Sequence, residues 1–470
     1  MAPTRAAAPR DDVLPHRTGS VATMVELALG HNAPRACAAV VDTLVDTVAV
    51  TVAGQRTETV RTLRRWLDRE PATGDAALWG TGERAAPSRA ALVNGTASHA
   101  LDYDDAGLTM PIHPSAVLWP AVLALATPRT PTARLLAAVE AGHVLIRALA
   151  DVVPIGAHYD RGWHATSTLG VLAATAAAAA VAGLTPEQAG HAIGIAASTA
   201  AGSLANFGTM TKPLHSGRAA ADAVTAVGLA RAGFTANPAE LDDPRGFLAR
   251  YGAPAEQAAD LGERVSRWRD AWVGDCAVKQ FAACFGTHRA LAAVVRLRPE
   301  VPDLDRVERI RVEAHPATLR PLRTGLPATG DEARFSMAFN VAHALRTGGV
   351  GPGDFTPEAI AANADLMSRV DTVAADAPSD GEDLGGRRFA RVEITLSGGR
   401  TVARTVTLDT PEDRPEAAAI DDKLVRCLTA VGVESETAAG LPARVRAAAA
   451  APSAAGLADV LSLHLIEEES

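Results

Sequence analysis

The residues best suited to chemistry lie in one short stretch, Leu92–Pro120, which holds two histidines and three aspartates in a chain rich in small apolar residues. They are His99, Asp102, Asp104, Asp105 and His113. Histidine titrates near neutral pH, and crowding can raise the pKa of a carboxylate toward it, so these side chains could be general acids and bases. Two other interpretations stay open. One is a metal site, although no HExxH-type spacing is present, and the other is a cluster of caps and hydrogen bonds that only fixes the loop.

Two further clusters follow, each just before a helix of small residues. His164 lies in Asp160–Ser167, after a flexible turn. The positive end of a helix at that place would favour a bound carboxylate. Lys212, His215 and Arg218 lie close together in what we expect to be a loop opening into the next helix. Such cations suit a polyanionic small molecule, but a structural histidine and a solvated basic loop explain the same residues.

A fourth cluster, Cys276–Arg289, contains two candidates of unequal interest. Cys284 could be a nucleophile, but no base partner can be argued for it, so a buried structural thiol is the better interpretation. Lys279 is expected at a domain junction, from which a lysine can reach into an interdomain cleft. Ligand sites tend to lie in such clefts.

Helices must position most of these residues, because apolar residues in the first part of the chain recur at three-and-four spacing between Gly, Pro, Asn and Asp. The predicted helices are Val21–Leu29, Arg35–Val52, Thr57–Glu70, Ser88–His99, Ala116–Leu125, Leu135–Leu149, Leu169–Ala182, Glu187–Ala200 and Gly217–Ala232. The later ones are rich in Ala and Gly, whose small side chains let helix axes approach closely. We therefore predict a compact all-helical bundle.

The pattern changes near Asp275, where apolar and polar residues begin to alternate in short segments, as in half-buried strands. The predicted strands are Val307–Ala314, Arg388–Leu396 and Thr401–Leu408, the last two joined by a hairpin turn at Ser397–Arg400. Helices are predicted between them at Phe281–Leu297, Ala333–Thr347 and Pro357–Ser368, and helix returns after Pro411.

The predicted fold class is therefore mainly α, with a large all-helical domain and a smaller inserted α+β lid domain. Residues 1–18 are expected to be a flexible N-terminal tail. Residues 19–265 plus 409–470 are expected to form the helical domain, and residues 266–408 the lid domain. A chain of 470 residues is long enough for two or three domains.

Composition narrows the class of protein. The formal net charge is −9, which gives no electrostatic reason to expect a nucleic acid as partner. The four cysteines are widely spaced, which disfavours a disulfide scaffold and a structural zinc site. The N-terminus has no apolar run, and the longest such run, Val171–Gly183, is shorter than the roughly 20 residues of a membrane span. We expect a soluble cytoplasmic protein that binds no membrane.

Taken together, the clusters resemble the MmgE/PrpD family, which includes 2-methylcitrate dehydratase, cis-aconitate decarboxylase and iminodisuccinate epimerase. The matching segments, in family order, are Asn94-Gly95 with His99, Leu101–Asp105, His113–Ser115, Gly162–Thr166, Lys212–Ala220, Gly233–Thr235, Lys279 through Cys284 to His288, and Arg334–Ser336 followed by Gly348 and Phe355-Thr356. The resemblance implies a helical domain with a smaller lid domain, a homodimer, and a cofactor-free, metal-free active site in the cleft between the domains.

The resemblance also implies site residues and a substrate class. Asp102, His113, His164 and Lys212 match the active-site positions of cis-aconitate decarboxylase, and we expect His215, Lys279, Arg218 and Thr166 to bind substrate. Known members act on small di- or tricarboxylates. We expect His113 and His164 to transfer protons, Lys212 to hold a substrate carboxylate, and Asp102 to orient an imidazole or act as the base.

This chain departs from the decarboxylase pattern in three places. Ala106 stands where decarboxylases have Thr, the loop Ala106–Ile112 is longer and lacks an extra His-Pro, and no lid Tyr is evident in Leu319–Pro327. We therefore favour a lyase of the 2-methylcitrate dehydratase type. The alternatives are cis-aconitate decarboxylation, epimerisation as in iminodisuccinate epimerase, and a non-catalytic binding protein that has kept the fold.

Overall fold

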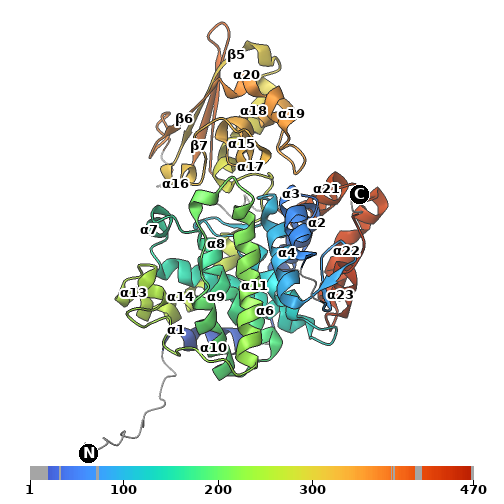
Figure 1. The fold of residues 1–470 in the computed structure, drawn as a ribbon. Coiled ribbons are helices and arrows are strands. Elements are labelled where there is room, and N and C mark those ends of the chain that lie inside the picture. Colours follow the sequence, from blue (N-terminus) through green and yellow to red (C-terminus); the bar gives the residue numbers. More distant parts are fainter. Residues whose placement is uncertain are drawn as a thin grey trace, which may run out of the picture.

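The computed structural model describes residues 19–30, 33–69, 73–382, 384, 387–407 and 415–466. Figure 1 shows a large helical body and, above it, a smaller region that contains the main sheet. The expected mainly α class is confirmed, with a smaller sheet region. That this region works as a lid stays a prediction. The predicted tail, residues 1–18, lies outside the described residues.

The helical body is built from the N-terminal part of the chain and the C-terminal helices. Its helices are α1 (Ser20–Gly30), α2 (Cys37–Gly54), α3 (Glu58–Leu67), α4 (Pro87–Ala100), α5 (Ser115–Leu125), α6 (Thr132–Val152), α7 (Ile155–Asp160), α8 (Ala165–Thr168), α9 (Gly170–Ala182), α10 (Pro186–Ala197), α11 (Thr211–Arg231), α12 (Phe247–Arg250), α13 (Ala255–Ala259), α14 (Leu261–Ala271), α21 (Ala417–Ala430), α22 (Ser435–Ala450) and α23 (Ala455–Leu461). Two short antiparallel strands, β1 (Ala76–Ala77) and β2 (Arg84–Ala85), pair beside α4. Two segments, Cys37–Gly54 and Ala165–Ala182, are long and apolar enough to span a membrane, but 72% and 94% of their residues are buried inside the protein.

Glycine decides how closely α4 and α11 pack. A Cβ at Gly95 of α4 would lie 2.9 Å from the Cα of Gly217 on α11, and a Cβ at Gly217 would lie 2.2 Å from the Thr96 hydroxyl oxygen. Neither distance leaves room for a methyl group, so only glycine permits this contact. Asp102 follows α4 and Lys212 begins α11, so the contact also sets the distance between two predicted site residues.

Helix α11 begins six residues before the predicted start at Gly217. Lys212 and His215 therefore lie on the helix together with Arg218, and the predicted loop is wrong at Lys212 and His215. Pro213 falls in the first turn, where a missing N–H group costs nothing.

Four strands form the main sheet of the smaller region. In spatial order they are β6 (Val370–Ala374), β5 (Val307–Ala314), β7 (Ala390–Leu396) and β8 (Thr401–Val406). β5 pairs parallel to β6 and antiparallel to β7, and β7 pairs antiparallel to β8. The predicted first strand and hairpin are confirmed, although Leu408 lies outside the described residues. The sequence did not predict β6, because its residues are at most half-buried and show no clear alternation.

Helices of the smaller region cover one side of this sheet, where α15 packs on β7 and β8, α18 packs on β6, and the two helices touch. The helices are α15 (His288–Leu297), α16 (Pro316–Leu319), α17 (Gly330–Ala333), α18 (Met337–Thr347), α19 (Pro357–Ala362) and α20 (Ala364–Met367). The predicted helix from Phe281 is wrong over its first seven residues. The backbone amides of Ala282 and Cys284 donate to the carbonyls of Val350 and Arg334. Because these amides bond to distant residues, they do not form the hydrogen bonds of a helix.

Two contacts hold the acidic loop in place close to the predicted site. The strand β3 (Ala106–Gly107) pairs antiparallel with β4 (Cys276–Ala277), three residues before Lys279. At the other end of the chain, α21 packs against α2. Buried Lys423 on α21 contacts Asp46 on α2 at 2.5 Å and donates to the Tyr103 carbonyl at 2.6 Å. The chain's last helices therefore support the acidic loop from behind.

Candidate active site

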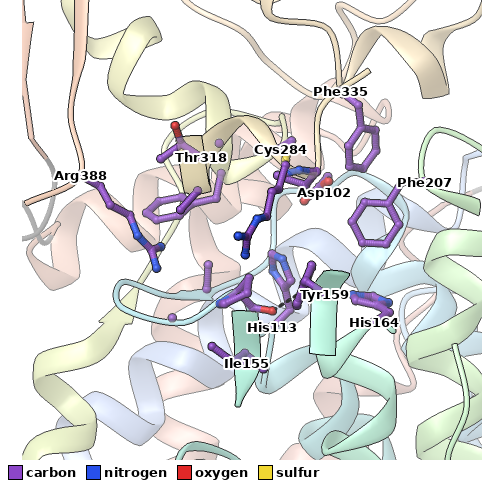
Figure 2. Close-up of a pocket in the computed structure, with 18 of the residues that line it drawn as sticks. Asp102, His113, Ile155, Tyr159, His164, Phe207, Cys284, Thr318, Phe335 and Arg388 are labelled. Atoms are coloured by element: carbon purple, nitrogen blue, oxygen red, sulfur yellow. Dashed lines mark hydrogen bonds between the residues drawn. The ribbon is translucent and has the colours of Figure 1, made fainter. Parts of the chain in front are cut away.

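One cavity gathers the residues that the sequence singled out for catalysis, where the helical body meets the sheet region. Asp102, His113, His164 and Lys212 all line it. Figure 2 shows several of these side chains pointing into a common space, with Phe335 and Thr318 above and Ile155 below. The cavity volume is about 160 Å³.

Asp102 holds two lysines at the floor of this cavity. Its carboxylate accepts a hydrogen bond from Lys212 Nζ at 2.8 Å and pairs through its other oxygen with Lys279 Nζ, which also donates to the Asp102 carbonyl at 2.8 Å. Asp102 has φ of +49°, a left-handed conformation found at no other non-glycine residue in the described part of the chain. Burial alone would raise the pKa of Asp102, but the two ammonium groups lower it well below its ordinary value.

The two ammonium groups share the Asp102 carboxylate, and the nearby Asp104 carboxylate also stabilises the charge of Lys279. Lys212 Nζ also lies 5.4 Å from the centre of the Phe207 ring and 5.1 Å from that of Phe335. The aromatic faces attract the cation and displace water from around it. An organic carboxylate entering the cavity would meet Lys212 in surroundings of low dielectric, where the attraction is strong.

His113 is held as a neutral base with one free nitrogen. Its Nδ1 donates to the Asp105 carbonyl at 2.9 Å, and a carbonyl only accepts, so the proton resides on Nδ1 and leaves a lone pair on Nε2. The His113 backbone amide donates to the Thr166 hydroxyl at 3.1 Å, which fixes the loop. Burial and the nearby Lys279 charge lower the pKa of His113 well below its ordinary value, so the ring stays neutral at pH 7.

His164 lies across the cavity at the start of α8. Its Nδ1 is 3.2 Å from Nδ1 of His215, and its ring stacks on His99 with centroids 5.7 Å apart. Buried Nε2 of His164 has no hydrogen-bond partner among the described residues. Burial, with the neighbouring His99 and His215, lowers the pKa of His164 well below its ordinary value. This ring can therefore accept a proton from a bound molecule, or pass one to it.

Asp104, not Asp102, contacts the imidazoles. Its carboxylate accepts from His99 Nδ1 at 2.8 Å and lies 3.4 Å from His113 Nδ1. Burial would raise the pKa of Asp104, but the two histidines lower it below its ordinary value. The expected imidazole-orienting role of Asp102 therefore falls to Asp104, because both carboxylate oxygens of Asp102 are engaged by lysines.

Two groups of side chains in the described residues have ligand atoms close enough to share a metal ion. They are His99, Asp104 and His113, and Asp105, His143 and Cys276. The first group lies next to Lys212 and Lys279, whose positive charges would repel a metal cation. In the second, the His143 ring lies 3.2 Å from the Arg147 guanidinium. A metal-free site stays our prediction.

A chain of buried hydrogen bonds runs behind the cavity. Asp105 accepts from the Ser115 amide at 3.0 Å and hydroxyl at 2.8 Å, and that hydroxyl lies 3.2 Å from His143 Nε2. Arg147 continues the chain and donates to Asp275 at 2.9 Å, just before β4. Burial and the nearby Asp46 charge raise the pKa of Asp105 to about 7. This chain fixes the loop that carries His113.

The four residues expected to bind substrate take four different positions. Lys279 is fully buried and reaches the cavity only through Asp102, and Thr166 holds the His113 backbone. His215 lies behind His164. Arg218 lies outside the cavity and forms an ion pair with Asp222 at 2.7 Å. Its position follows from helix geometry, since six residues at about 100° each turn Arg218 well away from the face of Lys212.

Other lining residues escaped the sequence analysis. Tyr159 donates to the Pro111 carbonyl at 2.7 Å, and so braces the loop that leads to His113. Arg289, Arg320 and Arg388 line the cavity from the sheet region. No local pattern marks them, because surface and cavity arginines look alike in sequence. Cys284 lines the cavity too, and burial raises the pKa of its thiol to about 11, as expected of a structural thiol.

Comparison with known proteins identifies a family for this chain. Residues 21–259 match the family model for the MmgE/PrpD N-terminal domain, and residues 281–442 match that for the MmgE/PrpD C-terminal domain. The chain belongs to the MmgE/PrpD family. The boundary between the matched domains falls at the segment that carries β4 and Lys279.

Several curated relatives resemble most of this MmgE/PrpD chain. Cis-aconitate decarboxylase of Homo sapiens is 28% identical over 82% of this chain and 81% of its own length. Cis-aconitate decarboxylase of Mus musculus is 28% identical over 76% of this chain and 75% of its own. Cis-aconitate decarboxylase-like protein oryM of Aspergillus oryzae is 27% identical over 79% of this chain and 82% of its own length. These relatives support an enzyme of the lyase kind without fixing its reaction.

Proposed function

We propose that this protein is a cofactor-independent lyase that acts on a small polycarboxylate by proton transfer at a carbon next to a carboxylate. The observation that supports this most is the floor of the cavity, where Lys212 and Lys279 share the single carboxylate of Asp102. Of the two lysines, Lys212 lines the cavity, where its ammonium group can attract a substrate carboxylate. His113 and His164 line the same cavity as neutral imidazoles beside it.

In the proposed reaction, Lys212 binds the carboxylate next to the reacting carbon and stabilises the negative charge that builds up there. In dehydration, one imidazole removes the proton from this carbon, the electron pair forms a carbon–carbon double bond, and the hydroxyl leaves as water with a proton from the second imidazole. In decarboxylation, the bond to a carboxylate breaks, CO₂ leaves, and the carbon receives a proton.

Each of these two reactions has support. Ala106 lines the cavity with a methyl group where decarboxylases carry a threonine hydroxyl, and this favours dehydration of the 2-methylcitrate type as our first candidate. The names of the relatives favour decarboxylation of cis-aconitate as the second. We propose a homodimer by the same family resemblance.

The test is a panel of citrate, 2-methylcitrate, cis-aconitate and iminodisuccinate, followed by NMR in D₂O. We expect one acid to lose water or CO₂, with deuterium entering at the carbon next to a carboxylate. His164→Ala protein purified in the same way is the control for contaminating enzymes. If no acid in the panel reacts or exchanges protons, a binding protein becomes the better interpretation.

A further inference from the structure

The cavity has a second, unexplained concentration of charge. Its lining contains one acid, Asp102, and four cations. Lys212 comes from the helical body and pairs with Asp102. The other three cations, Arg289, Arg320 and Arg388, come from the sheet region. The acid–base groups come from the helical body. The two sides of the cavity therefore supply different chemistry.

Arg388 lies away from the His164 imidazole. In Figure 2, Arg388 enters from one end of the cavity and His164 lies at the other, with His113 between them. The Arg388 guanidinium donates to the Thr109 carbonyl at 2.8 Å, in the loop before His113. Its charge is thereby held over the cavity mouth.

The wall that carries the other two arginines is tightly packed. Arg289, on α15, is 1% exposed, and its guanidinium lies 5.5 Å from the centre of the Phe285 ring. A Cβ at Gly286 would lie 2.2 Å from the Thr318 carbonyl oxygen, so α16 packs directly against this segment. Arg320 follows α16, where it lies 3.5 Å from Asp160. The packing holds the buried Arg289 in place, whereas Arg320 is an exposed side chain at the edge of this wall.

We propose that Arg289, Arg320 and Arg388 form a second anion subsite, which binds the substrate carboxylate farthest from the reacting carbon. The planar guanidinium group matches a carboxylate with two parallel hydrogen bonds, and the buried Arg289 attracts an anion most strongly. The subsite selects acids with three carboxylates over acids with two. This inference rests on the proposed function, which defines the reacting carbon. The binding preference can nevertheless be measured without turnover.

The experiment uses two unreactive acids that differ by one carboxylate. Propane-1,2,3-tricarboxylate and methylsuccinate are both saturated and have no hydroxyl group to lose. Calorimetric titration of the full chain should show the tricarboxylate binding about 10- to 100-fold more tightly, as expected for one added charge-assisted contact. Arg289→Gln should remove most of this preference and change methylsuccinate binding by less than about 3-fold.

Arg296→Gln is the matched control, because Arg296 lies on the same helix, is exposed and does not line the cavity. It should leave both affinities unchanged. Arg388→Gln, at the mouth, should weaken binding of the tricarboxylate about 3- to 10-fold. This variant replaces Arg289→Gln in the test if Arg289→Gln fails to fold.

Equal affinity of the two acids for the unmodified protein would overturn the inference, as would an unchanged preference in both arginine variants. A different result would overturn the proposed function and leave the subsite standing. A clear tricarboxylate preference in a protein that turns over nothing in the panel would retain the subsite and remove the lyase.

Discussion

At the scale of single residues, each histidine of the site is held neutral by burial and by the lysine charges around it. Neutral imidazoles can accept protons at pH 7, whereas a histidine with an ordinary pKa would be partly protonated just below it. The lowered pKa values of His113 and His164 therefore keep both rings ready as bases over a wider range of pH.

Replacing either ring should remove a proton-transfer group and leave the fold intact. We expect His113→Ala and His164→Ala each to lower kcat on the true substrate by about 10²- to 10⁴-fold. The unmodified protein should keep kcat/KM nearly constant from pH 7.5 to pH 6.5, with loss only at lower pH. Steady-state kinetics and thermal melting check both points. Full activity in both variants would show that the imidazoles do not transfer protons.

Asp102 and its two lysines should behave as one unit. Asp102→Asn leaves two buried ammonium groups without a counter-charge, and we expect it to lower the free energy of unfolding by about 3–5 kcal/mol. Adding Lys279→Met removes one of those charges, so the double variant should be more stable than Asp102→Asn alone. Denaturant unfolding of the two single variants and the double variant measures this coupling. Additive effects would contradict the shared ion pair.

At the scale of elements, the contact between α4 and α11 sets the distance between Asp102 and Lys212. It depends on Gly95 and Gly217, which lie in the segments Asn94-Gly95 and Lys212–Ala220 that carried the family resemblance. The glycines of these motifs therefore serve packing, and the site depends on them indirectly.

Gly217→Ala should force the two helices apart. We expect it to lower the free energy of unfolding by about 1–3 kcal/mol, because the added methyl overlaps Thr96, and to lower kcat by displacing Lys212. Gly228→Ala is the matched control on the same helix, since a Cβ there meets nothing within 4 Å. It should raise the free energy of unfolding by up to about 1 kcal/mol. Denaturant unfolding should give the two substitutions opposite signs.

At the scale of the whole molecule, burying many neutral histidines makes stability depend on pH. Burial lowers the pKa of His99, of His143 and, to about 3, of His288. In the unfolded chain these rings bind protons below about pH 6.5. The unfolded state then binds more protons than the folded one, so stability is present above pH 6.5 and is lost as pH falls below it.

The free energy of unfolding should therefore fall from pH 6.5 to pH 5, although buried Asp105, whose pKa is raised to about 7, has the opposite effect and offsets one of these rings. Each neutral buried ring contributes about 1.4 kcal/mol per pH unit to the slope in the lower part of this range. His288→Gln should reduce the slope by one such contribution. Urea unfolding at a series of pH values measures it. A stability that rises as pH falls from 6.5 would contradict the buried neutral state.

The sequence by itself determined the mainly α class, the family, and the four residues that share the cavity. Helical periodicity is a local property of the chain, and Asp102, His113, His164 and Lys212 stand in short motifs that can be recognised without coordinates. It also predicted β5 and the β7–β8 hairpin, because alternation and a Gly-Gly turn are equally local.

Only the tertiary structure decided what each of these groups touches. Lys279 meets Asp102 across 177 residues of chain, and Arg334 meets the Leu101 carbonyl across 233, so neither contact leaves a local pattern. For the same reason Asp104 took the place of Asp102 beside the imidazoles, and Arg289 came to line the cavity that Arg218 does not reach. Charge and burial depend on neighbours in space, and distant segments supply those neighbours only when the chain has folded.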